Sequence, residues 1–530
     1  MNPHLQRLTD ALRQEEAWQK RELEAALARP RNERLALGVA WPLVKAEPGP
    51  ELILRARAPL HDGIRAGDPI DIQGVSAWVE EVEGPVAVVN TQADLPPGEL
   101  EVTKRFDPTP FTRGHQALRR VDECDGPLRE AWLDDEANEA IELLHGPPGT
   151  GKTWTSSHRI ADAVREGDRP WALADSNAAA DNLALACVDR GLTVLRVGRA
   201  ARMHPLVRPF SLEDQINSEP SVAVVLKALR KARGPDRGRL HGELRGLRRV
   251  VRRNLVGGSD VLVSTLATLV RHAPQLPPPE LALVDEATQA LEPLLMAPLP
   301  FAQRLLLVGD PHQLGPVVKQ PGNPLQHDAF TRLVQRQGAP MLEVQYRMDR
   351  RIQALVQPVY GPDYRPHPSV ADHGQAPLFI DTAGAGFDEQ RDPVTMSLHN
   401  PGERRLVSLV VDALRAKGLE DIGIIAPYSA QVHRLRERFP DLEVATVNAF
   451  QGRERQAIVC TWVRSNDVGE LGFVADRRRL TVAVTRAREA LVLIGDSATL
   501  AGHPVFAQLL DDCEAASAWE EPWSGAMEDA

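Results

Sequence analysis

The segment GPPGTGKT at residues 146–153 has the residue types and spacing of a phosphate-binding loop. Its glycines let the backbone curl so that N–H groups face a phosphate, and its lysine and threonine can reach the β- and γ-phosphates and Mg²⁺. The apolar run IELLH precedes the segment and a helical pattern follows it, as the motif requires. The residues predicted to bind nucleotide here are Gly146, Pro147, Pro148, Gly149, Thr150, Gly151, Lys152 and Thr153.

An acidic pair, Asp285 and Glu286, follows the apolar run LALV. Carboxylates at the tip of a buried strand are costly unless they hold a metal or a proton. We expect Asp285 to bind Mg²⁺ together with Thr153, and Glu286 to act as the base that polarises the attacking water. The alternative is that the pair only caps a helix, and the phosphate loop upstream weighs against it.

Three further side chains could act on the γ-phosphate. Gln313 follows the run LLLVGD, where its amide could sense the state of the nucleotide. Arg347 in EVQYRMD and Arg486 in LTVAVTRAREA could stabilise the charge that develops as the phosphate bond breaks. The alternative for either arginine, taken singly, is that it is an ordinary surface residue.

The elements that must position these side chains follow from two series of apolar runs separated by helical patterns. The first series is IELLHG, RPWALADS, TVLRVG, DVLVST, LALVDE and RLLLVGD. The second series is LFIDTAG, DIGIIAPY, EVATVNAF, AIVCTWV and ALVLIGD. Continuous apolar strands alternating with helices indicate buried parallel sheets. The predicted fold class is therefore α/β, with two sheet domains that meet near residues 335–345.

Two segments differ from this pattern. Short alternating strands with frequent turn signals predict a small antiparallel β-barrel near the N-terminus. A helical, arginine-rich stretch inside the first sheet domain predicts a basic hairpin, with a solvated charged face as the alternative. The predicted segments are an N-terminal helix or stalk (1–35), the barrel (36–110), the first sheet domain (111–204 and 256–338), the basic insert (205–255), the second sheet domain (339–500) and an acidic tail (501–530).

Composition excludes some classes of protein. The 530 residues carry a net charge of −11, which excludes a basic coat protein that binds nucleic acid by bulk charge. The four cysteines lack zinc-ribbon spacing and are expected to be reduced, which favours the cytoplasm. The N-terminal segment lacks the apolar region of a secretory signal and no run is long enough to span a bilayer, so no membrane partner is expected.

Ten motifs in order over residues 146–488 resemble the motif series of superfamily 1 helicases. They are GPPGTGKT, SNAAADNLA, DVLVSTLATL, VDEATQALE, LLLVGDPHQLGPVV, LEVQYRM, IGIIAPYSAQ, ATVNAFQGRE, WVRSN and RRLTVAVTRAR. The DEATQ, GDPHQL, QYRM and FQGRE forms are most similar to the 1B branch, the group of the nonsense-mediated-decay and immunoglobulin-mu-binding helicases. The resemblance implies two tandem RecA-like P-loop domains that clamp ATP, with a barrel before the phosphate loop and a helical insert after the first motifs.

The resemblance also implies roles for residues that match the motifs. Tyr346 would stack on adenine and Glu454 would contact the nucleotide. A track for a single nucleic-acid strand would be lined by Ser176, Asn177, Ser264, Thr265, Pro427, Tyr428, Thr446 and Arg464. Leu128 stands where family members carry a glutamine that reads adenine, so the preference for ATP over other nucleotides is left open.

The activity implied by the resemblance is that of an ATP-dependent helicase. Such a chain would use ATP and Mg²⁺ to move along single-stranded DNA or RNA, in the 5′→3′ direction, and would unwind duplexes at single-strand junctions as a monomer. An alternative is an ATP-gated nucleic-acid-binding or ribonucleoprotein-remodelling protein that does not unwind productively. The choice between DNA and RNA stays open, because a 2′-OH contact depends on geometry that motifs do not encode.

Overall fold

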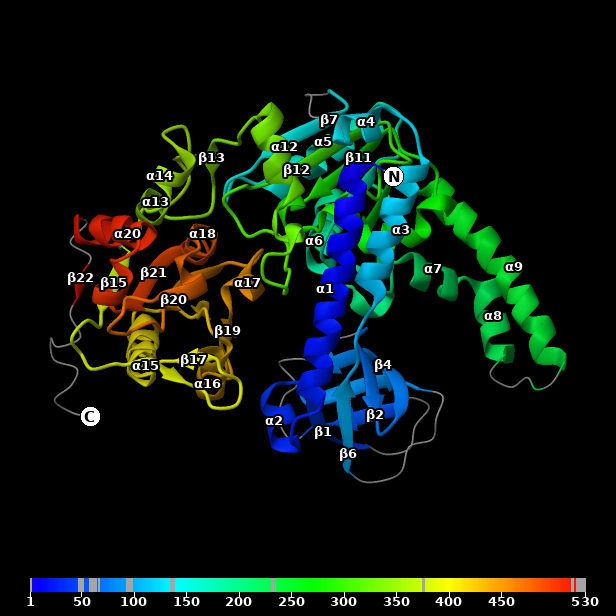
Figure 1. The fold of residues 1–530 in the computed structure, drawn as a ribbon. Coiled ribbons are helices and arrows are strands. Elements are labelled where there is room, and N and C mark those ends of the chain that lie inside the picture. The colour runs from blue at the N-terminus through cyan, green and yellow to red at the C-terminus, as the bar shows by residue number, and fades with distance from the viewer. Residues whose placement is uncertain are drawn as a thin grey trace. The chain divides into compact units, whose positions relative to one another are not determined.

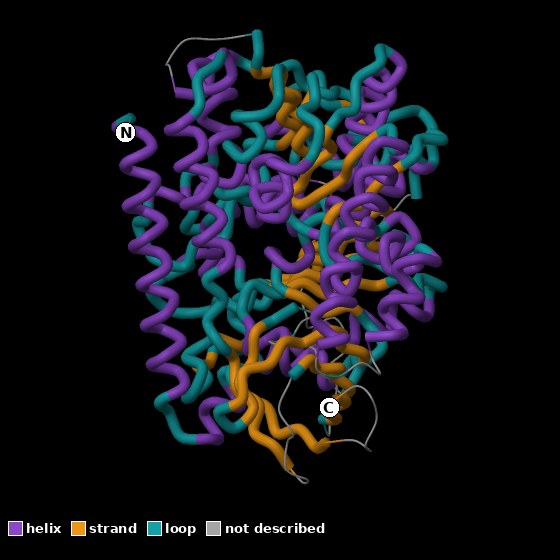
Figure 2. The backbone as a smooth tube through the Cα atoms, turned by 90° about the vertical axis from the view of Figure 1, so that its right-hand side faces the viewer, coloured by secondary structure: helices purple, strands orange, loops and turns teal. Residues whose placement is uncertain are grey.

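The computed structural model describes most of the chain as a mixed α/β protein (Figures 1 and 2). The described residues are 2–45, 52–56, 64, 67–91, 99–133, 139–229, 233, 235–373, 377–515 and 519–520. The chain divides into two compact units, and each is considered by itself. Unit 1 comprises Met1–Leu144, Lys152–Gly309 and Gly315–Pro340, and unit 2 comprises His145–Gly151, Asp310–Leu314 and Met341–Ala530.

Unit 1 begins with a long helix and a small barrel. Figure 2 shows α1 as one continuous helix, whose buried residues Leu5, Leu8 and Leu12 recur at the spacing of one helix face. Pro30 separates α1 (Pro3–Leu27) from α2 (Arg31–Ala36). Six antiparallel strands then close a barrel in the order β1-β2-β5-β4-β3-β6, which confirms the predicted N-terminal barrel. These strands are β1 (Ala40–Lys45), β2 (Leu52–Arg55), β3 (Pro69–Ile72), β4 (Val75–Glu83), β5 (Val86–Asn90) and β6 (Glu99–Lys104).

The first sheet has six strands in the order β7-β12-β11-β8-β10-β9. Its strands are β7 (Ile141–His145), β8 (Trp171–Ala174), β9 (Val194–Val197), β10 (Val261–Thr265), β11 (Leu281–Asp285) and β12 (Arg304–Gly309). The pairs described within it are parallel. The side chains predicted to bind ligands are therefore expected at the carboxyl ends of the strands, where a parallel sheet usually binds ligands. Asp285 and Thr265 are each the last residue of a strand.

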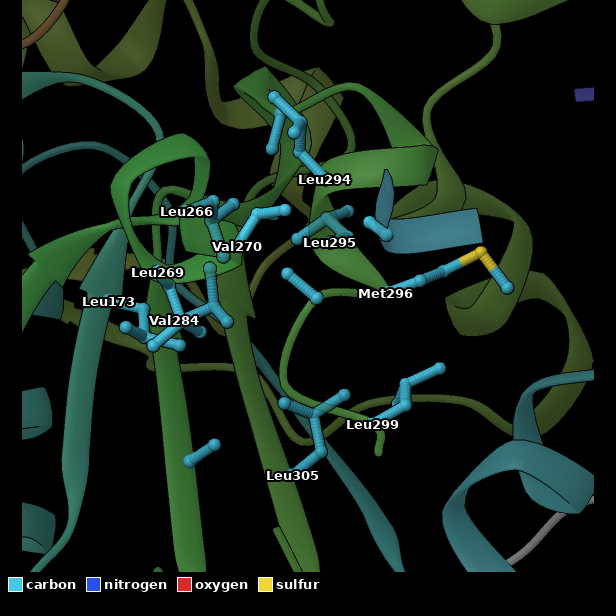
Figure 3. Close-up of a cluster of buried hydrophobic side chains, with 14 of the residues drawn as sticks. Leu173, Leu266, Leu269, Val270, Val284, Leu294, Leu295, Met296, Leu299 and Leu305 are labelled. Atoms are coloured by element: carbon cyan, nitrogen blue, oxygen red, sulfur yellow. The ribbon is translucent and has the colours of Figure 1, made fainter. Parts of the chain in front are cut away.

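Helices pack against this sheet, and their apolar side chains form a buried core with those of the strands. They are α3 (Thr109–Glu123), α4 (Pro127–Leu133), α5 (Lys152–Arg165), α6 (Asn177–Val188), α10 (Leu266–His272), α11 (Glu292–Leu295) and α12 (Ala329–Gln337). Figure 3 shows leucine, valine and methionine side chains from β8, α10, β11, α11, β12 and the segment after α11 meeting in one buried cluster. Burial of such side chains removes apolar surface from water and is the main stabilising term for the sheet that carries the site.

Three helices follow β9 in the segment that the sequence predicts as a basic insert. They are α7 (Leu212–Ser218), α8 (Pro220–Leu229) and α9 (Pro235–Gly258), and of the three only α9 carries arginines. Val222, Val225 and Leu244 form a small apolar core between the three helices. Arg230 and Lys231, which belong to the predicted basic stretch, lie outside the described residues.

Unit 2 contains the second six-stranded sheet, in the order β19-β18-β20-β21-β15-β22. Its strands are β15 (Leu378–Asp381), β18 (Ile422–Ile425), β19 (Glu443–Ala445), β20 (Arg455–Thr461), β21 (Ala487–Gly495) and β22 (Trp519–Glu520). The described pairings are parallel, which confirms the predicted mixed α/β class with parallel sheets. Of the predicted acidic tail (501–530), the described part includes a helix, α20 (Pro504–Ala515), and β22, and the residues from 521 onward lie outside the described residues.

Helices and two-stranded pairs complete unit 2. The helices of unit 2 are α13 (Arg350–Ala354), α14 (Gln357–Tyr360), α15 (Pro401–Ala416), α16 (Ser429–Arg438), α17 (Val447–Phe450), α18 (Arg477–Val484), α19 (Ser497–Leu500) and α20 (Pro504–Ala515). Its two-stranded pairs are β13 (Val344–Gln345) with β14 (Arg365–Pro366), and β16 (Gln390–Arg391) with β17 (Leu398–His399). Among the described residues, no helix combines the length and apolar character needed to cross a bilayer.

Candidate functional site

The phosphate-binding loop connects β7 to α5 and depends on glycine at two positions. The backbone φ is +74° at Gly149 and +78° at Gly151, a region that residues with a Cβ atom avoid. A Cβ added at Gly149 would lie 2.8 Å from Cβ of Arg347, which leaves no room for it. The Thr150 hydroxyl donates to the Pro147 carbonyl oxygen at 2.8 Å and closes the turn. The residue types of the loop therefore determine its conformation. Gly146 and Pro148 are buried within the loop.

Lys152 and Thr153 are the first two residues of α5, in unit 1. The Thr153 hydroxyl donates to Oδ2 of Asp285 at 2.8 Å. Nζ of Lys152 lies 3.8 Å from Oε1 of Glu286. The structure thus brings together four of the residues predicted to be catalytic or metal-binding. They lie at the N-terminal end of α5, where the helix dipole favours an anion.

Asp285 occupies an environment that disfavours its charge. Its exposed fraction is 1%. Burial, reinforced by the negative charge of Glu286, raises the pKa of Asp285 to about 6, although the Thr153 hydroxyl and Lys152 act in the opposite direction. A cation beside Asp285 would relieve this cost, because an opposite charge stabilises the carboxylate.

The donors around Asp285 fit Mg²⁺. A hydroxyl and a carboxylate oxygen are hard ligands, and Mg²⁺ in nucleotide sites takes one or two protein ligands together with phosphate oxygens and water. Within the described part of the chain, no group of three or more His, Cys, Asp and Glu side chains could hold a metal by itself. The pair Thr153 and Asp285 therefore suits an ion that arrives with a phosphate substrate.

Glu286 has an unusual backbone. Its φ and ψ are 53° and 43°, the left-handed region that residues other than glycine enter only where the surroundings hold them. Its Oε2 accepts a hydrogen bond from Nε2 of Gln289 at 3.1 Å. The carboxylate of Glu286 is thus directed by its own backbone and by a neighbouring amide, and it is less buried than Asp285.

A network around Asp310, in unit 2, holds the predicted sensor Gln313. Nε2 of Gln313 donates to Oδ2 of Asp310 at 2.8 Å, and the hydroxyl of Tyr360 donates to the same oxygen at 2.8 Å. The other oxygen lies 3.1 Å from Nε2 of His145. Asp310 accepts one N–H of the Gln313 amide nitrogen, so the second N–H and the amide oxygen are the groups left to meet a ligand.

Asp310, Tyr360 and His145 are residues that the sequence reasoning missed. The motif GDPHQL contains Asp310, so its place beside Gln313 is visible in the sequence, but its partners are 165 and 50 residues away. Tyr364 is another missed residue, and its hydroxyl donates to the Pro148 carbonyl oxygen of the phosphate loop at 2.7 Å.

The segment Gln345–Arg347 lies against the phosphate loop within unit 2. The backbone N–H of Tyr346 donates to the Gly149 carbonyl oxygen at 2.9 Å. The Tyr346 ring is 58% exposed and stacks on His367 with ring centres 4.5 Å apart. Arg347 forms an ion pair with Glu454. Three predicted nucleotide contacts, Tyr346, Arg347 and Glu454, are therefore neighbours, and the exposed ring is suited to stacking on a base.

Arg486 is buried, with 2% of its surface exposed. Its Nε donates to the Val482 carbonyl oxygen at 2.9 Å and its Nη2 to the Thr485 hydroxyl at 3.0 Å. These hydrogen bonds hold the buried guanidinium in place. Because a carbonyl oxygen and a hydroxyl are uncharged, they do not neutralise its positive charge.

The predicted strand contacts of unit 1 lie at the ends of β8 and β10. Ser176 caps α6 by accepting from the Ala179 N–H at 3.1 Å. Thr265 caps α10 in the same way, and Ser264 is buried and donates to the Thr265 carbonyl oxygen. Asn177 is partly exposed and accepts a hydrogen bond from Arg196 at 3.1 Å.

The predicted strand contacts of unit 2 differ in exposure. Pro427 and Thr446 are partly exposed, and Thr446 caps α17. Arg464 is 4% exposed, and its Nε donates to Oε2 of Glu389 at 2.7 Å while Nη1 donates to the Tyr428 hydroxyl at 3.2 Å. The guanidinium of Arg464 therefore holds Tyr428, which the motif alone does not indicate.

Leu128 is 2% exposed and belongs to the apolar cluster of unit 1. It lies on α4, where Trp132 is also buried. A buried aliphatic side chain offers no hydrogen bond to a base.

Comparison with known proteins identifies similar families. Two family models, both described as AAA domain, match residues 125–234 and 223–321 in one case and residues 325–498 in the other. DNA-binding protein SMUBP-2 of Mesocricetus auratus is 35% identical over 451 residues, which are 76% of this chain and 45% of that protein. The chain thus spans less than half the length of that relative.

Two further relatives are more distant. A regulator of nonsense transcripts 1 homolog of Arabidopsis thaliana is 30% identical over 412 residues, which are 70% of this chain and 32% of that protein. An uncharacterized ATP-dependent helicase of Methanocaldococcus jannaschii is 28% identical over 491 residues, which are 74% of this chain and 73% of that protein. Taken together, the two family models match residues 125–321 and 325–498, which include the motifs from the phosphate loop onward.

Proposed function

Because this chain belongs to the superfamily 1B helicases, the group that contains SMUBP-2 and the regulators of nonsense transcripts, we propose that it is an ATP-dependent helicase. It hydrolyses ATP to move along a single nucleic-acid strand in the 5′→3′ direction and separates duplexes. The observation that carries the proposal is the meeting of Lys152, Thr153, Asp285 and Glu286 at the start of α5. These are the groups that phosphoryl transfer to water needs.

Each of these groups has a distinct role in the proposed hydrolysis. Lys152 binds the β- and γ-phosphates, and Thr153 and Asp285 hold Mg²⁺, which when bound neutralises charge on the phosphates. Glu286 takes the proton of the attacking water, since its carboxylate is directed by the Gln289 amide and remains more accessible than Asp285.

The remaining nucleotide contacts come from unit 2. We assign to Gln313 the sensing of the γ-phosphate through the second N–H of its amide nitrogen, which can donate to a phosphate oxygen while Asp310 accepts the first. Arg347 and Arg486 stabilise the charge that develops in the transition state. Tyr346 stacks on the base and Glu454 acts on the nucleotide through its ion pair with Arg347.

The proposed strand track uses both sheets. Ser176, Asn177, Ser264 and Thr265 contact the strand from the first sheet domain, and Pro427, Tyr428, Thr446 and Arg464 contact it from the second. Hydroxyl and amide side chains suit phosphate and sugar contacts, which position a strand without reading its sequence. The relative SMUBP-2 is a DNA-binding protein, which supports nucleic acid as the partner.

The proposed organisation follows the predicted segments, with a stalk, a barrel and a basic helical insert attached to the first of two RecA-like domains. We further propose that the protein acts as a cytoplasmic monomer. All four cysteines are unpaired, which suits a reducing compartment.

The proposal is tested by the rate of ATP hydrolysis with and without a single strand. We expect single-stranded DNA or RNA to raise the rate at least tenfold, and comparison of the two identifies the preferred strand. Repeating the assay with GTP tests the consequence of Leu128, and comparable rates with ATP and GTP are expected. A rate that neither strand changes would contradict the proposal.

A further inference from the structure

Arg196 is a buried charged residue of unit 1 that the proposed hydrolysis does not use. It lies on β9, and its exposed fraction is 0%. Its Nε donates to Oδ1 of Asp181 at 2.9 Å, and its Nη1 donates to the Val197 carbonyl oxygen at 2.8 Å. Burying a guanidinium costs desolvation free energy unless the group is fully paired. Packing alone therefore does not explain why an arginine occupies this position.

The third hydrogen bond of Arg196 fixes an amide. Its Nη2 donates to Oδ1 of Asn177 at 3.1 Å. A guanidinium can only donate, so the amide oxygen of Asn177 must face Arg196 and the amide nitrogen must face away from it. The nitrogen carries two N–H donors, and Asn177 is partly exposed at the first position of α6. The buried pair therefore determines which end of the amide is presented outward.

A cavity of about 470 Å³ adjoins this amide. Asn177, Asn182, Arg202 and His204 line it with groups that can donate hydrogen bonds. Asp181 is the one acid among its lining residues, and both of its oxygens are occupied. Oδ1 accepts from Arg196, and Oδ2 accepts from the His204 N–H at 2.7 Å. The cavity thus offers donors and no free carboxylate.

We propose that the Arg196–Asp181 pair is a positioning device that turns the Asn177 amide nitrogen toward this cavity, where it binds a phosphate of the single strand. This inference rests on the proposed function. Asp181 also accepts from the backbone N–H of His204, another residue that lines the cavity, so one buried ion pair holds two of the lining residues. Leu185 and Met203 supply apolar surface suited to a sugar.

Arginine is required for this role because three acceptors must be held at once. The planar fork reaches Asp181, Val197 and Asn177 through separate nitrogens. Lysine has a single ammonium at the end of a flexible chain and cannot reproduce this geometry. Arg196→Lys keeps the charge that pairs with Asp181 but releases the Asn177 amide, which can then rotate.

The first test uses Asn177→Asp in the full chain. The new carboxylate still accepts from Arg196, so the melting temperature should be unchanged or raised, while two outward donors are replaced by a negative charge. We expect the Kd for a fluorescein-labelled oligonucleotide, measured by anisotropy at fixed salt, to rise at least tenfold. Asn32→Asp, the same change on the exposed face of α2, controls for net charge and should shift Kd less than twofold.

The second test is a double-mutant cycle that separates positioning from general stability. Arg196→Lys should raise Kd severalfold in the wild-type background and have no further effect in the Asn177→Ala background, because the amide that it positions is then missing. An equal loss in both backgrounds would mean that Arg196 acts only through stability and would overturn the inference. So would an Asn177→Asp variant that binds like the wild type. A wild-type protein that binds no strand contradicts the proposed function itself.

Discussion

Asp285 and Glu286 are consecutive in the chain, but their surroundings separate their chemistry. Asp285 is buried against the Thr153 hydroxyl, and burial raises its pKa to about 6. Glu286 is more accessible and is held by the Gln289 amide. Two carboxylates placed in different environments can take different roles, one as an ion ligand and one as a base.

A first prediction concerns Glu286 alone. Glu286→Gln should lower the kcat for strand-stimulated ATP hydrolysis by about 10²–10⁴-fold, because an amide cannot take the proton of the attacking water. The change preserves size and the Gln289 contact, so binding of a fluorescent ATP analogue should persist. Steady-state phosphate release measures the rate, and Glu280→Gln at an exposed position is the matched control. A kcat within twofold of the wild type would remove Glu286 from its assigned role.

Glu403 is a second buried carboxylate, at the start of α15 in unit 2. Its exposed fraction is 0%, and Oε2 accepts from the Thr461 hydroxyl and from the Val463 N–H at 2.9 Å. Burial raises the pKa of Glu403 to about 8, well above its ordinary value of 4.5. The protonated form is therefore the one that the folded protein favours at neutral pH.

This environment predicts a pH-dependent stability. A group whose pKa is raised on folding contributes stability below its unfolded pKa and loses it as pH rises through the folded pKa, which places the window between about pH 4.5 and 8. Glu403→Gln removes the titration, so its melting temperature should rise relative to the wild type as pH goes from 5 to 8.5. The shift corresponds to ~2–5 kcal/mol at the alkaline end. A difference between the two proteins that does not change with pH would contradict this assignment.

At the scale of elements, α1 is tied to the segment that follows the Gln313 motif. Glu15 is 1% exposed, and its two carboxylate oxygens accept from the backbone N–H groups of Lys319 at 2.7 Å and Gln320 at 2.9 Å. The Asn323 amide donates to the Ala11 carbonyl oxygen at 3.0 Å. Unit 1 thus uses one helix near the N-terminus to hold a loop some 300 residues later in the chain.

This contact predicts a stability cost for Glu15→Ala. Two backbone donors would lose their acceptors, which lowers the free energy of unfolding by ~1–3 kcal/mol. Glu15→Gln keeps one acceptor and should cost less. Urea unfolding measures both variants, with Glu22→Ala on the exposed face of α1 as the control. Equal stability of Glu15→Ala and the control would show that the contact contributes nothing.

The elements were more predictable than the contacts between their side chains. Continuous apolar runs such as LALV and RLLLVG identify β11 and β12, because a strand buried on both faces has few polar positions. The two-residue strands β13, β14, β16 and β17 carry no such signal. The phosphate loop was predictable since its geometry restricts the residue types, whereas Glu389 beside Arg464 is 75 residues distant and no local pattern connects the two.

For the whole molecule, charge distribution matters more than the net charge of −11. The exposed arginines of α9 concentrate positive charge on one element, namely Arg237, Arg239, Arg245, Arg248, Arg249 and Arg253. The strand contacts proposed here are mostly hydroxyl and amide groups, which release few counterions. We therefore expect the logarithm of the strand Kd to change only shallowly with the logarithm of salt concentration, by the slope of a few phosphate contacts. Anisotropy titrations between 50 and 200 mM salt measure it, and a slope near that of ten contacts would contradict the proposed track.

The central claim is that ATP hydrolysis at Lys152 drives strand separation. Its most direct test is a duplex with a single-stranded 5′ tail, incubated with ATP and either the wild-type protein or Lys152→Ala. We predict that the wild type separates the strands of the 5′-tailed duplex, that a 3′-tailed duplex stays paired, and that Lys152→Ala separates neither. Strand-stimulated hydrolysis without separation would favour an ATP-gated binding or remodelling protein, and separation that persists in Lys152→Ala would contradict the account.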